Sequence, residues 1–294
     1  MKKKEEMSKE EKLALLTRIV EGEDYLTDYL PVLKEFLDDE DAEVRKLAIS
    51  GLWDYPDPEM IDPLLEKATD DPSPEVRCQA IIALGRYIYE GEMADYDFDW
   101  GALEEIMREG ELPEEDFLRV KDFLLAVYRD EGKSLDERRF AVEALGFLGD
   151  PEVCAIIEEA YAHPDLKMKV SAIFAMGRSG LVRWSDIILK ELDSPIRELQ
   201  LEAIRAAGEI GLDEAGEALL RLTYADDRLV RLEAIWALGQ TGWEGAFERL
   251  DELACFGEDK EVRRVAKEAL EDWYLYSGSL DDFYREGFGE FDEE

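Results

Sequence analysis

The stretch Val230-Arg231-Leu232-Glu233-Ala234-Ile235-Trp236-Ala237-Leu238-Gly239 is one copy of a pattern that recurs along nearly the whole chain. The pattern consists of an apolar residue, an Arg, an Ala three residues later, a second Ala three further on, and then Leu and Gly. Its small-residue pairs are Ala48 and Gly51, Ala80 and Ala83, Ala141 and Ala144, Ala172 and Ala175, Ala203 and Ala206, Ala234 and Ala237, and Ala266 and Ala269. From Ala141 through Ala172 and Ala203 to Ala234 the copies are evenly spaced. A fixed period of this length indicates a repeat protein.

The spacing within each copy predicts a helix, because residues three and four apart share one face of a helix. A row of Ala on that face favours helix and lets a neighbouring helix approach closely. We expect the closing Gly at the helix end, where a positive φ is often required. The closing residues are Gly85, Gly146, Gly177, Gly208 and Gly239. A second apolar run follows each Gly, so each repeat is predicted to be a motif helix followed by a second, antiparallel helix, and such hairpins must stack to bury their apolar faces.

The motif Val-Arg-x-x-Ala-x-x-Ala-Leu-Gly, read at residues 76–85 and 230–239, resembles HEAT repeats in the short bacterial form that phycobiliprotein lyases also contain. The resemblance covers roughly residues 24–276. It implies an all-α fold, a right-handed α/α superhelix (solenoid) of about seven to eight HEAT-like helical hairpins with the second helices on the concave side. We therefore expect a solenoid over residues 1–276 and an acidic, aromatic tail over residues 277–294.

The period fails once, because the separation of Leu84 from Leu145 is nearly twice the regular step. We predict an insertion over residues 88–112, which starts with an acidic loop at residues 90–99. A helix near residues 113–130 should then serve as the second helix of that repeat. Loops longer than a few residues are often functional.

The chain is predicted to begin with a helical hairpin over residues 8–21 and 24–38. Ser8 is expected to cap the first helix, and Glu11 stands three residues later, as a capping box requires.

The formal net charge of −39 over 294 residues is the strongest compositional signal. A nucleic-acid-binding protein carries a basic face, and an anionic membrane would repel this chain, so we expect neither as a partner. Basic proteins or peptides are favoured partners, although the charge can also serve solubility alone. No apolar run approaches the roughly 20 residues of a membrane span. The start Met1-Lys2-Lys3-Lys4-Glu5-Glu6 lacks the apolar stretch of a signal peptide, so we expect a cytoplasmic protein.

Catalytic and cofactor signatures are weak. His163 is the only histidine and is expected at the end of a helix, where a cation complements the helix dipole. Gly177-Arg178-Ser179-Gly180 is predicted to be an inter-helix turn, because it lacks the Lys and the length of a phosphate-binding loop. The odd set Cys78, Cys154 and Cys255 indicates small core residues, not a disulfide or metal set. We therefore expect no catalytic residue, no cofactor and no enzyme activity.

An acidic loop imitates the start of a calcium-binding EF-hand through Asp95, Asp97 and Asp99. The match fails because Trp100 replaces the invariant Gly and Ile106 replaces the bidentate Glu. We therefore expect no metal there, but the three aspartates are candidate partner-binding residues.

Two rows of side chains are candidate interaction surfaces. Asp186, Glu217 and Glu248 are separated by the same step as the motif copies and should project from successive second helices, either as a partner-binding row or as a solvated face. A second row, on the motif helices, consists of Phe174, Arg205 and Trp236. This second row is either a partner patch or a set of side chains packed under a neighbouring turn.

The Arg of the motif could form an anion-binding stripe. We expect instead that it bonds acidic side chains of the turns between repeats, with Asp39 bound to Arg45 and Asp71 bound to Arg77.

These observations favour a non-enzymatic scaffold or adaptor that binds a protein or peptide, with a basic surface, through the solenoid. Two alternatives stay open. One is an accessory protein like the phycobiliprotein lyases, which the resemblance implies. The other is an acidic nucleic-acid mimic that occupies a basic groove, which the charge implies.

Overall fold

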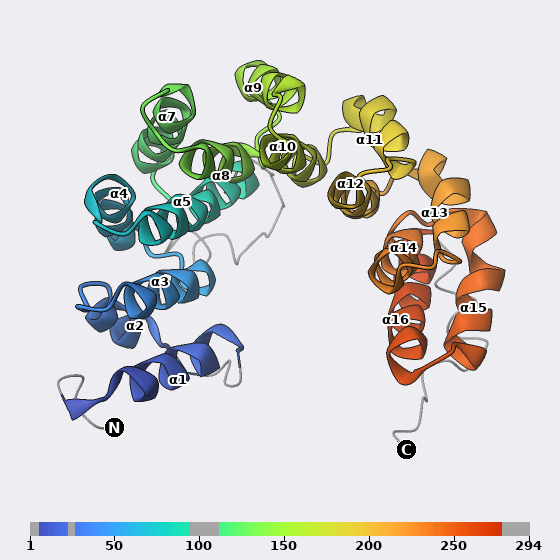
Figure 1. Cartoon of the computed structure of the whole chain (residues 1–294), viewed down its shortest axis with the longest axis horizontal. Helices are drawn as coiled ribbons and strands as arrows, with labels where there is room; N and C mark the ends of the chain where they lie inside the picture. The colour runs from blue at the N-terminus through green and yellow to red at the C-terminus, as the bar shows by residue number, and fades with distance from the viewer. Residues whose placement is uncertain (1–5, 23–26, 95–111, 278–294) are drawn as a thin grey trace, which may run out of the picture. The chain divides into compact units, whose positions relative to one another are not determined.

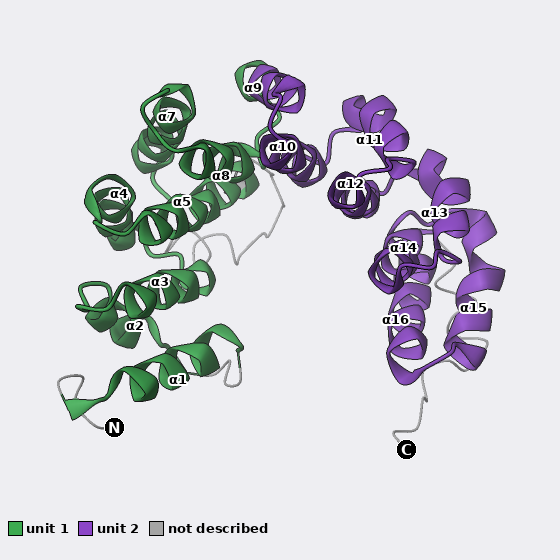
Figure 2. Cartoon of the chain, viewed as in Figure 1, with its two compact units in different colours: residues 1–153 green, residues 154–294 purple. Residues whose placement is uncertain are grey.

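The computed structural model of the chain describes residues 6–22, 27–94 and 112–277. Within these ranges the chain is helical and contains no strand (Figure 1). It forms two compact units, residues 1–153 and residues 154–294, which Figure 2 colours separately. The all-α fold that the sequence predicts is therefore confirmed.

Most of the described helices follow one another through short connections. Those of unit 1 are α1 (Lys9–Val20), α2 (Leu30–Phe36), α3 (Ala42–Gly51), α4 (Ile61–Asp70), α5 (Pro74–Ala94), α7 (Glu114–Arg129) and α8 (Leu135–Leu145). Helix α9 (Pro151–Ala162) begins in unit 1 and ends in unit 2. Those of unit 2 are α10 (Leu166–Arg178), α11 (Ser185–Leu192), α12 (Arg197–Ile210), α13 (Gly216–Leu222), α14 (Arg228–Gln240), α15 (Phe247–Phe256) and α16 (Lys260–Tyr276). Single 3₁₀ turns are η2 (Leu52–Asp54), η3 (Pro58–Met60), η5 (Val182–Trp184), η6 (Asp213–Ala215) and η7 (Glu244–Ala246).

The helices that carry the repeated motif, called motif helices here, pack directly on one another. In unit 1, α3 packs against α5 and α5 against α8, and α1, which lacks the motif, packs against α3; in unit 2, α10 packs against α12, α12 against α14, and α14 against α16. The other helices, called intervening helices, pack mainly against the motif helix that follows them. These pairs are α2 with α3, α4 with α5, α7 with α8, α11 with α12, α13 with α14, and α15 with α16. The predicted hairpin order, with the motif helix first, is therefore wrong, and so is the predicted pairing of the first two helices.

The small residues of the motif form the contact between motif helices, as predicted. The first Ala of every copy is completely buried: Ala48, Ala80, Ala141, Ala172, Ala203, Ala234 and Ala266. The β-branched residue that follows it is buried as well: Ile49, Ile81, Val142, Ile173, Ile204 and Ile235. Complete burial of such a side chain contributes about 1.5–3 kcal/mol, so each repeat depends on its neighbours for much of its stability.

The Gly that closes the motif does not adopt a positive φ, contrary to the prediction. Most of these glycines lie inside their helices: Gly85, Gly177, Gly208 and Gly239. Gly146 caps α8, also with a negative φ of −60°. Positive φ occurs three residues later, at Gly180, Gly211 and Gly242, just after the ends of α10, α12 and α14.

The motif Gly is needed for space between neighbouring helices. A Cβ on Gly239 would stand 2.3 Å from the carbonyl oxygen of Ala269 and 2.7 Å from its Cα. A Cβ on Gly85 would stand 3.1 Å from the Cα of Ala144 in the next motif helix of unit 1. The glycine thus lets the motif helices approach until one backbone nearly touches the next.

This close approach explains how the helices of unit 2 are arranged. The stack of unit 2 curves, with α10, α12, α14 and α16 on the inner side and α11, α13 and α15 on the outer side (Figure 2). Small residues bring the motif helices close together, and the stack bends toward these helices. The expectation that the second helices line the concave side is therefore wrong for unit 2.

Local capping follows the sequence closely. Ser8 and Glu11 form the predicted capping box at the start of α1. Ser134 and Glu137 form another at the start of α8. Such caps satisfy backbone N–H groups that have no partner within the helix, and each typically contributes about 1 kcal/mol.

The predicted insertion begins with helix, not with a loop. Helix α5 continues to Ala94, so the loop expected from Glu90 is wrong over its first residues. Ile88 is completely buried. Gly91 lies against the ring of Phe117 on α7, where a Cβ would stand only 2.1 Å from a ring carbon. Ile88 and Gly91 are therefore packed within unit 1, whereas Met93 is exposed.

The rest of the predicted insertion has two parts. Residues 95–111 lie outside the described residues, and α7 (Glu114–Arg129) confirms the helix expected near residues 113–130. Of the predicted tail over residues 277–294, only Ser277 is described.

None of the described helices has the length and apolar character needed to cross a membrane. The cytoplasmic location stays a prediction.

Candidate functional site

The carboxylate row occupies equivalent places on three intervening helices of unit 2. Asp186, Glu217 and Glu248 lie in the first turns of α11, α13 and α15. A 3₁₀ turn precedes each helix, and its last residue is buried in every copy: Trp184, Ala215 and Ala246. This buried residue anchors the start of the helix, so the acidic residue two positions later is exposed each time.

No described residue neutralises the row. The carboxylates of Asp186, Glu217 and Glu248 form no hydrogen bond or ion pair with any residue that the structure describes. Basic residues that follow on the same helices, Lys190, Arg221 and Arg249, bind other carboxylates, those of Glu191, Asp193 and Glu252. Each acid of the row lies near a helix N-terminus, where the helix dipole favours a negative charge by about 0.3–1 kcal/mol. The helix dipoles therefore stabilise the negative charges of the row in the absence of a partner, and a cationic partner would stabilise them further.

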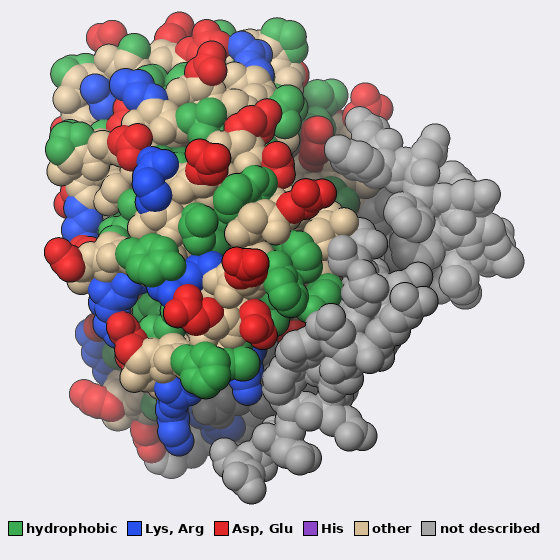
Figure 3. All heavy atoms as spheres, turned by 90° about the vertical axis from the view of Figure 1, so that its right-hand side faces the viewer, with side chains coloured by type: hydrophobic (Ala, Val, Ile, Leu, Met, Phe, Trp, Pro, Cys, Tyr) green, Lys and Arg blue, Asp and Glu red, His purple; other side chains and the backbone are tan. Residues whose placement is uncertain are grey.

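The row lies on the outer side of the curved stack of unit 2, because its residues belong to the intervening helices (Figure 2). Figure 3 shows the side of the molecule on which α13 and α15 lie. Acidic side chains there are dispersed among hydrophobic and basic ones and do not form one continuous patch. Any recognition by the row would thus rest on discrete carboxylates at repeat spacing.

The three aspartates of the acidic loop, Asp95, Asp97 and Asp99, lie outside the described residues. Their role in binding a partner stays a prediction. Across residues 6–22, 27–94 and 112–277, no group of His, Cys, Asp or Glu side chains is placed to hold a metal ion.

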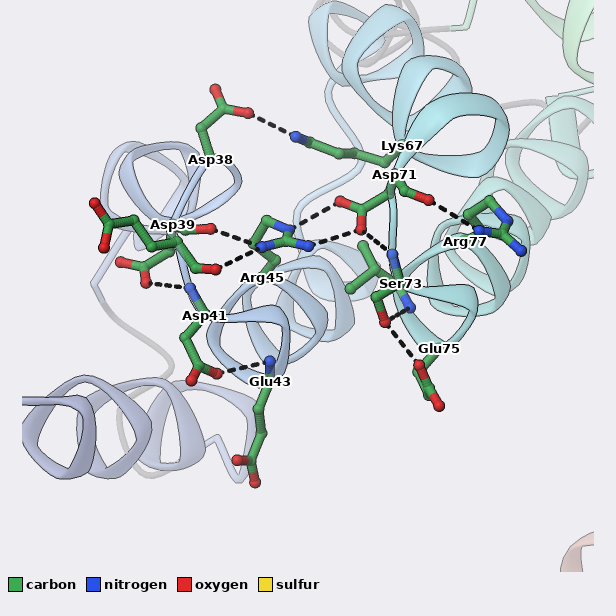
Figure 4. A network of polar contacts seen from close by, with 12 residues as sticks. Asp38, Asp39, Asp41, Glu43, Arg45, Lys67, Asp71, Ser73, Glu75 and Arg77 are labelled. Atoms are coloured by element: carbon green, nitrogen blue, oxygen red, sulfur yellow. Dashed lines mark hydrogen bonds and ion pairs between the residues drawn. The ribbon is translucent and has the colours of Figure 1, made fainter.

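The Arg of the motif binds neighbouring turns, but not through the predicted pairs of side chains. Arg45 donates to the backbone carbonyl of Asp39 at 2.8 Å, whereas its guanidinium forms a two-pronged ion pair with the carboxylate of Asp71 in the next turn, at 2.7 and 2.8 Å (Figure 4). Arg77 likewise donates to the backbone carbonyl of Asp71, at 2.9 Å. In each predicted pair the Arg thus binds the backbone carbonyl oxygen of the Asp and not its carboxylate. The carboxylate that the Arg binds belongs to the following repeat.

The same bridge recurs along the chain. The carboxylate of Glu137 accepts a hydrogen bond from Arg77 at 3.0 Å, and Arg231 pairs with Glu258 at 2.7 Å. Burial alone would raise the pKa of Glu137, but hydrogen bonds from Ser134 and Arg77 lower it to about 2. The pKa of Asp71 is likewise lowered against its burial by hydrogen bonds from Arg45 and Ser73. These arginines are bound within the protein, so the row is structural and not an anion-binding stripe.

The row of Phe174, Arg205 and Trp236 on the motif helices is only half-exposed. Arg205 forms an ion pair with Glu233 at 2.7 Å. Trp236 covers Gly208, where a Cβ would stand 2.9 Å from the indole ring. Two of the three side chains thus pack against a neighbouring repeat, which favours the structural interpretation.

His163 and the glycine turn also have structural roles. His163 directly follows the end of α9, as predicted, and its Nδ1 accepts a hydrogen bond from the backbone N–H of Asp165 at 3.0 Å. Gly177 and Arg178 belong to α10, so the predicted turn is confined to Ser179 and Gly180.

The three cysteines are not all core residues. Cys78 and Cys154 are buried, as predicted, but Cys255 is exposed on α15, so the prediction is wrong for that residue. Sequence alone placed it in a helix but could not give its side of that helix.

One feature of unit 1 was not predicted from the sequence. A cavity of about 320 Å³ lies among α3, α5 and α8 and is lined by Lys46, Cys78 and Arg139, among others. These three residues occupy the same position of the repeated motif, directly after its Arg. A small residue between two long ones at one motif position is a signal that the repeat alignment could have revealed.

Comparisons with known proteins agree with this geometry. The sequence model described as HEAT repeats matches residues 30–98 and 185–271, more than half of the chain, and the one described as PBS lyase HEAT-like repeat matches residues 137–163. No curated protein sequence matches the chain significantly.

Among solved structures, the complex of CpcE and CpcF of phycocyanin lyase from Nostoc sp. PCC7120 is similar with a TM-score of 0.54 and 16% identity, over 88% of this chain and 97% of that one. Importin beta is similar with a TM-score of 0.49 and 15% identity, over 96% of this chain and 41% of that one. Human deoxyhypusine hydroxylase is similar with a TM-score of 0.34 and 17% identity, over 89% of this chain and 99% of that one. At these identities the likenesses concern the fold alone. The repeated motif, the stacked helical hairpins and the family match together show that this chain belongs to the HEAT-repeat family.

Proposed function

We propose that this chain is a non-enzymatic interaction scaffold that binds a basic protein or peptide through the carboxylate row of unit 2. One observation carries the proposal: Asp186, Glu217 and Glu248 are exposed at equivalent places on successive helices and pair with no described residue. Their basic neighbours on the same helices are already paired. A cationic group of a partner would therefore stabilise the carboxylates of this row more than the acids of the surface that are already paired.

The physical basis is relief of repulsion. Like charges at repeat spacing repel one another, and the net charge of −39 adds to that repulsion. A partner that brings Lys or Arg to the row replaces repulsion with attraction. Exposed pairs contribute about 0.2–1 kcal/mol each, so three pairs together account for roughly a three- to hundredfold effect on affinity. The long-range field also steers a basic partner and raises its association rate.

A fluorescent octa-arginine peptide is a suitable probe for this chemistry. Its association with the parent should slow as salt rises, because the Debye length falls from about 10 Å at 0.1 M to about 3 Å at 1 M. Reversal of all three acids to Lys should weaken binding at least threefold in 0.1 M salt, with unchanged helicity.

The matched control reverses three exposed acids of unit 1 that also lack a described partner, Glu66, Asp70 and Asp122. Both variants change the net charge equally, so they differ only in where the charge changes. Equal binding by the parent and the row variant, or equal weakening in both variants, would show that charge acts in bulk and that the row has no special role.

A further inference from the structure

The cavity of unit 1 arises from a difference in side-chain length. Lys46, Cys78 and Arg139 stand at one motif position on neighbouring helices, so a short thiol is flanked by two long side chains. The resulting volume of about 320 Å³ is near the lower end of small-ligand sites, which span about 300–1,000 Å³. It suits a ligand of up to three rings.

Part of the lining of the cavity is apolar. Cys78, Ile82 and Pro74 contribute to it, and of these Cys78 is buried, Ile82 is half-buried and Pro74 is exposed. Burial raises the pKa of the Cys78 thiol to about 11, with a further contribution from Glu137, so the thiol is uncharged near pH 7. The guanidinium of Arg139 lies 3.7 Å from the centre of the Phe140 ring, and both residues belong to the lining. These walls present flat, uncharged or delocalised surfaces to a ligand.

The rim carries one cation without a bound carboxylate. The carboxylate of Asp136 accepts a hydrogen bond from Arg139 at 2.7 Å, and that of Glu75 accepts one from the hydroxyl of Ser73, also at 2.7 Å. Lys46 is exposed and has no hydrogen bond or ion pair to any described residue. The hydrogen bond from Ser73 is the main cause that lowers the pKa of Glu75, and the nearby charge of Lys46 makes a smaller contribution. The ammonium group of Lys46 is therefore the charge that remains available at the rim.

We propose that this cavity binds a small aromatic anion, with its rings on the surface of Phe140 and Arg139 and its carboxylate or sulfonate beside the ammonium of Lys46. Apolar burial supplies most of the affinity, and a hydrogen bond between charged groups orients the ligand. The proposal concerns unit 1 and a ligand of negative charge, so it is independent of the proposed binding of a basic partner by unit 2.

Two dyes of nearly equal shape test the proposal. 8-Anilinonaphthalene-1-sulfonate carries the anion, and N-phenyl-1-naphthylamine is its uncharged counterpart. The parent should bind the sulfonate at one saturable site, observed as enhanced fluorescence. Lys46→Gln should weaken that binding about three- to tenfold, because the rim is exposed and solvent weakens the interaction between the charged groups there. It should leave the binding of the uncharged dye unchanged.

Lys260→Gln is the matched control, because Lys260 is an exposed lysine of unit 2 and the net charge changes equally. Cys78→Phe, in protein whose helicity equals that of the parent, should fill the cavity and abolish the binding of both dyes. The proposal is overturned if the parent does not bind the sulfonate, if Lys260→Gln weakens it as much as Lys46→Gln, or if a folded Cys78→Phe variant still binds it.

Discussion

Substitution of the motif glycines by Ala should destabilise the protein in proportion to how closely the next helix approaches. A Cβ at position 239 would meet backbone atoms of Ala269 at 2.3–2.8 Å, where ordinary contacts begin near 3.4 Å. Backbone atoms cannot rotate away as a side chain can, so α14 and α16 must separate by about 1 Å. Such overpacking costs about 1–3 kcal/mol, and the upper end applies to Gly239.

The better helix propensity of Ala offsets about 1 kcal/mol of this cost. We therefore expect Gly239→Ala to lose about 2 kcal/mol of stability. At position 85 the nearest atoms are the Cα and Cβ of Ala144 at 3.1 Å, which requires a shift of only a few tenths of an ångström. There the strain of roughly 1 kcal/mol and the gain in propensity nearly cancel. Gly208→Ala, with Ala237 Cα at 3.0 Å and the ring of Trp236 at 2.9 Å, should fall between them.

Thermal unfolding followed by circular dichroism at 222 nm measures these differences. For a chain of this size, 1 kcal/mol shifts Tm by about 2–4 °C, so Gly239→Ala should lower it by roughly 4–8 °C and Gly85→Ala by less than about 2 °C. Gly180→Ala serves as a contrast, because no atom lies within 4 Å of the added Cβ but φ is +62°. Any loss of stability there comes from the backbone conformation alone. A neutral Gly239→Ala, or equal losses at positions 85 and 239, would refute the argument that the glycine serves close approach.

Three further outcomes are expected. Ala203→Glu places a charge at a completely buried contact between motif helices and should cost several kcal/mol, about 3–5 for an unpaired buried charge; an unchanged midpoint in chemical denaturation would show that the repeat alignment is wrong. Glu137→Gln should destabilise the protein at pH 7, and because the folded pKa of about 2 lies below the unfolded value of about 4.3, the contribution of Glu137 is present above about pH 5 and is lost as pH falls toward 2. The difference between parent and variant should therefore shrink in acid, and a difference that is constant from pH 7 to pH 2 would contradict the assignment. Replacement of residues 95–111 by a Gly/Ser linker should leave helicity close to that of the parent, whereas a replacement that also removes residues 88–94 should lower Tm clearly; equal behaviour of the two would mean that the end of α5 is not part of the core.

The sequence predicted the burial of the motif because the signal for it is periodic. Each Ala pair lies on one helix face, and a face that recurs at a constant step must meet its own copy in the next repeat. The exposed position of Glu217 and its equivalents was predictable on the same ground, since the period carries it from one intervening helix to the next.

The predictions that failed concern contacts between repeats that no local pattern reveals. In sequence, Gly239 resembles the glycine at a helix end. The structure shows that its role is instead to leave room for the backbone of Ala269 in the next motif helix. Arg45 was assigned to the acid of its own turn, but that turn offers a carbonyl, and the carboxylate of Asp71 arrives from the next repeat. The acids and the glycine near Glu90 resemble a loop, yet packing against α7 keeps them helical.

The spacing of the outer carboxylates is set from the opposite side of unit 2. On the inner side, Gly208 of α12 contacts Ala237 of α14. On the outer side, α13 and α15 carry Glu217 and Glu248. A methyl group added to Gly208 would push α12 and α14 apart on the inner side and so reduce the curvature of the stack. The curvature of the surface that carries these carboxylates therefore depends on the size of one buried side chain in each repeat, and not on any residue of that surface.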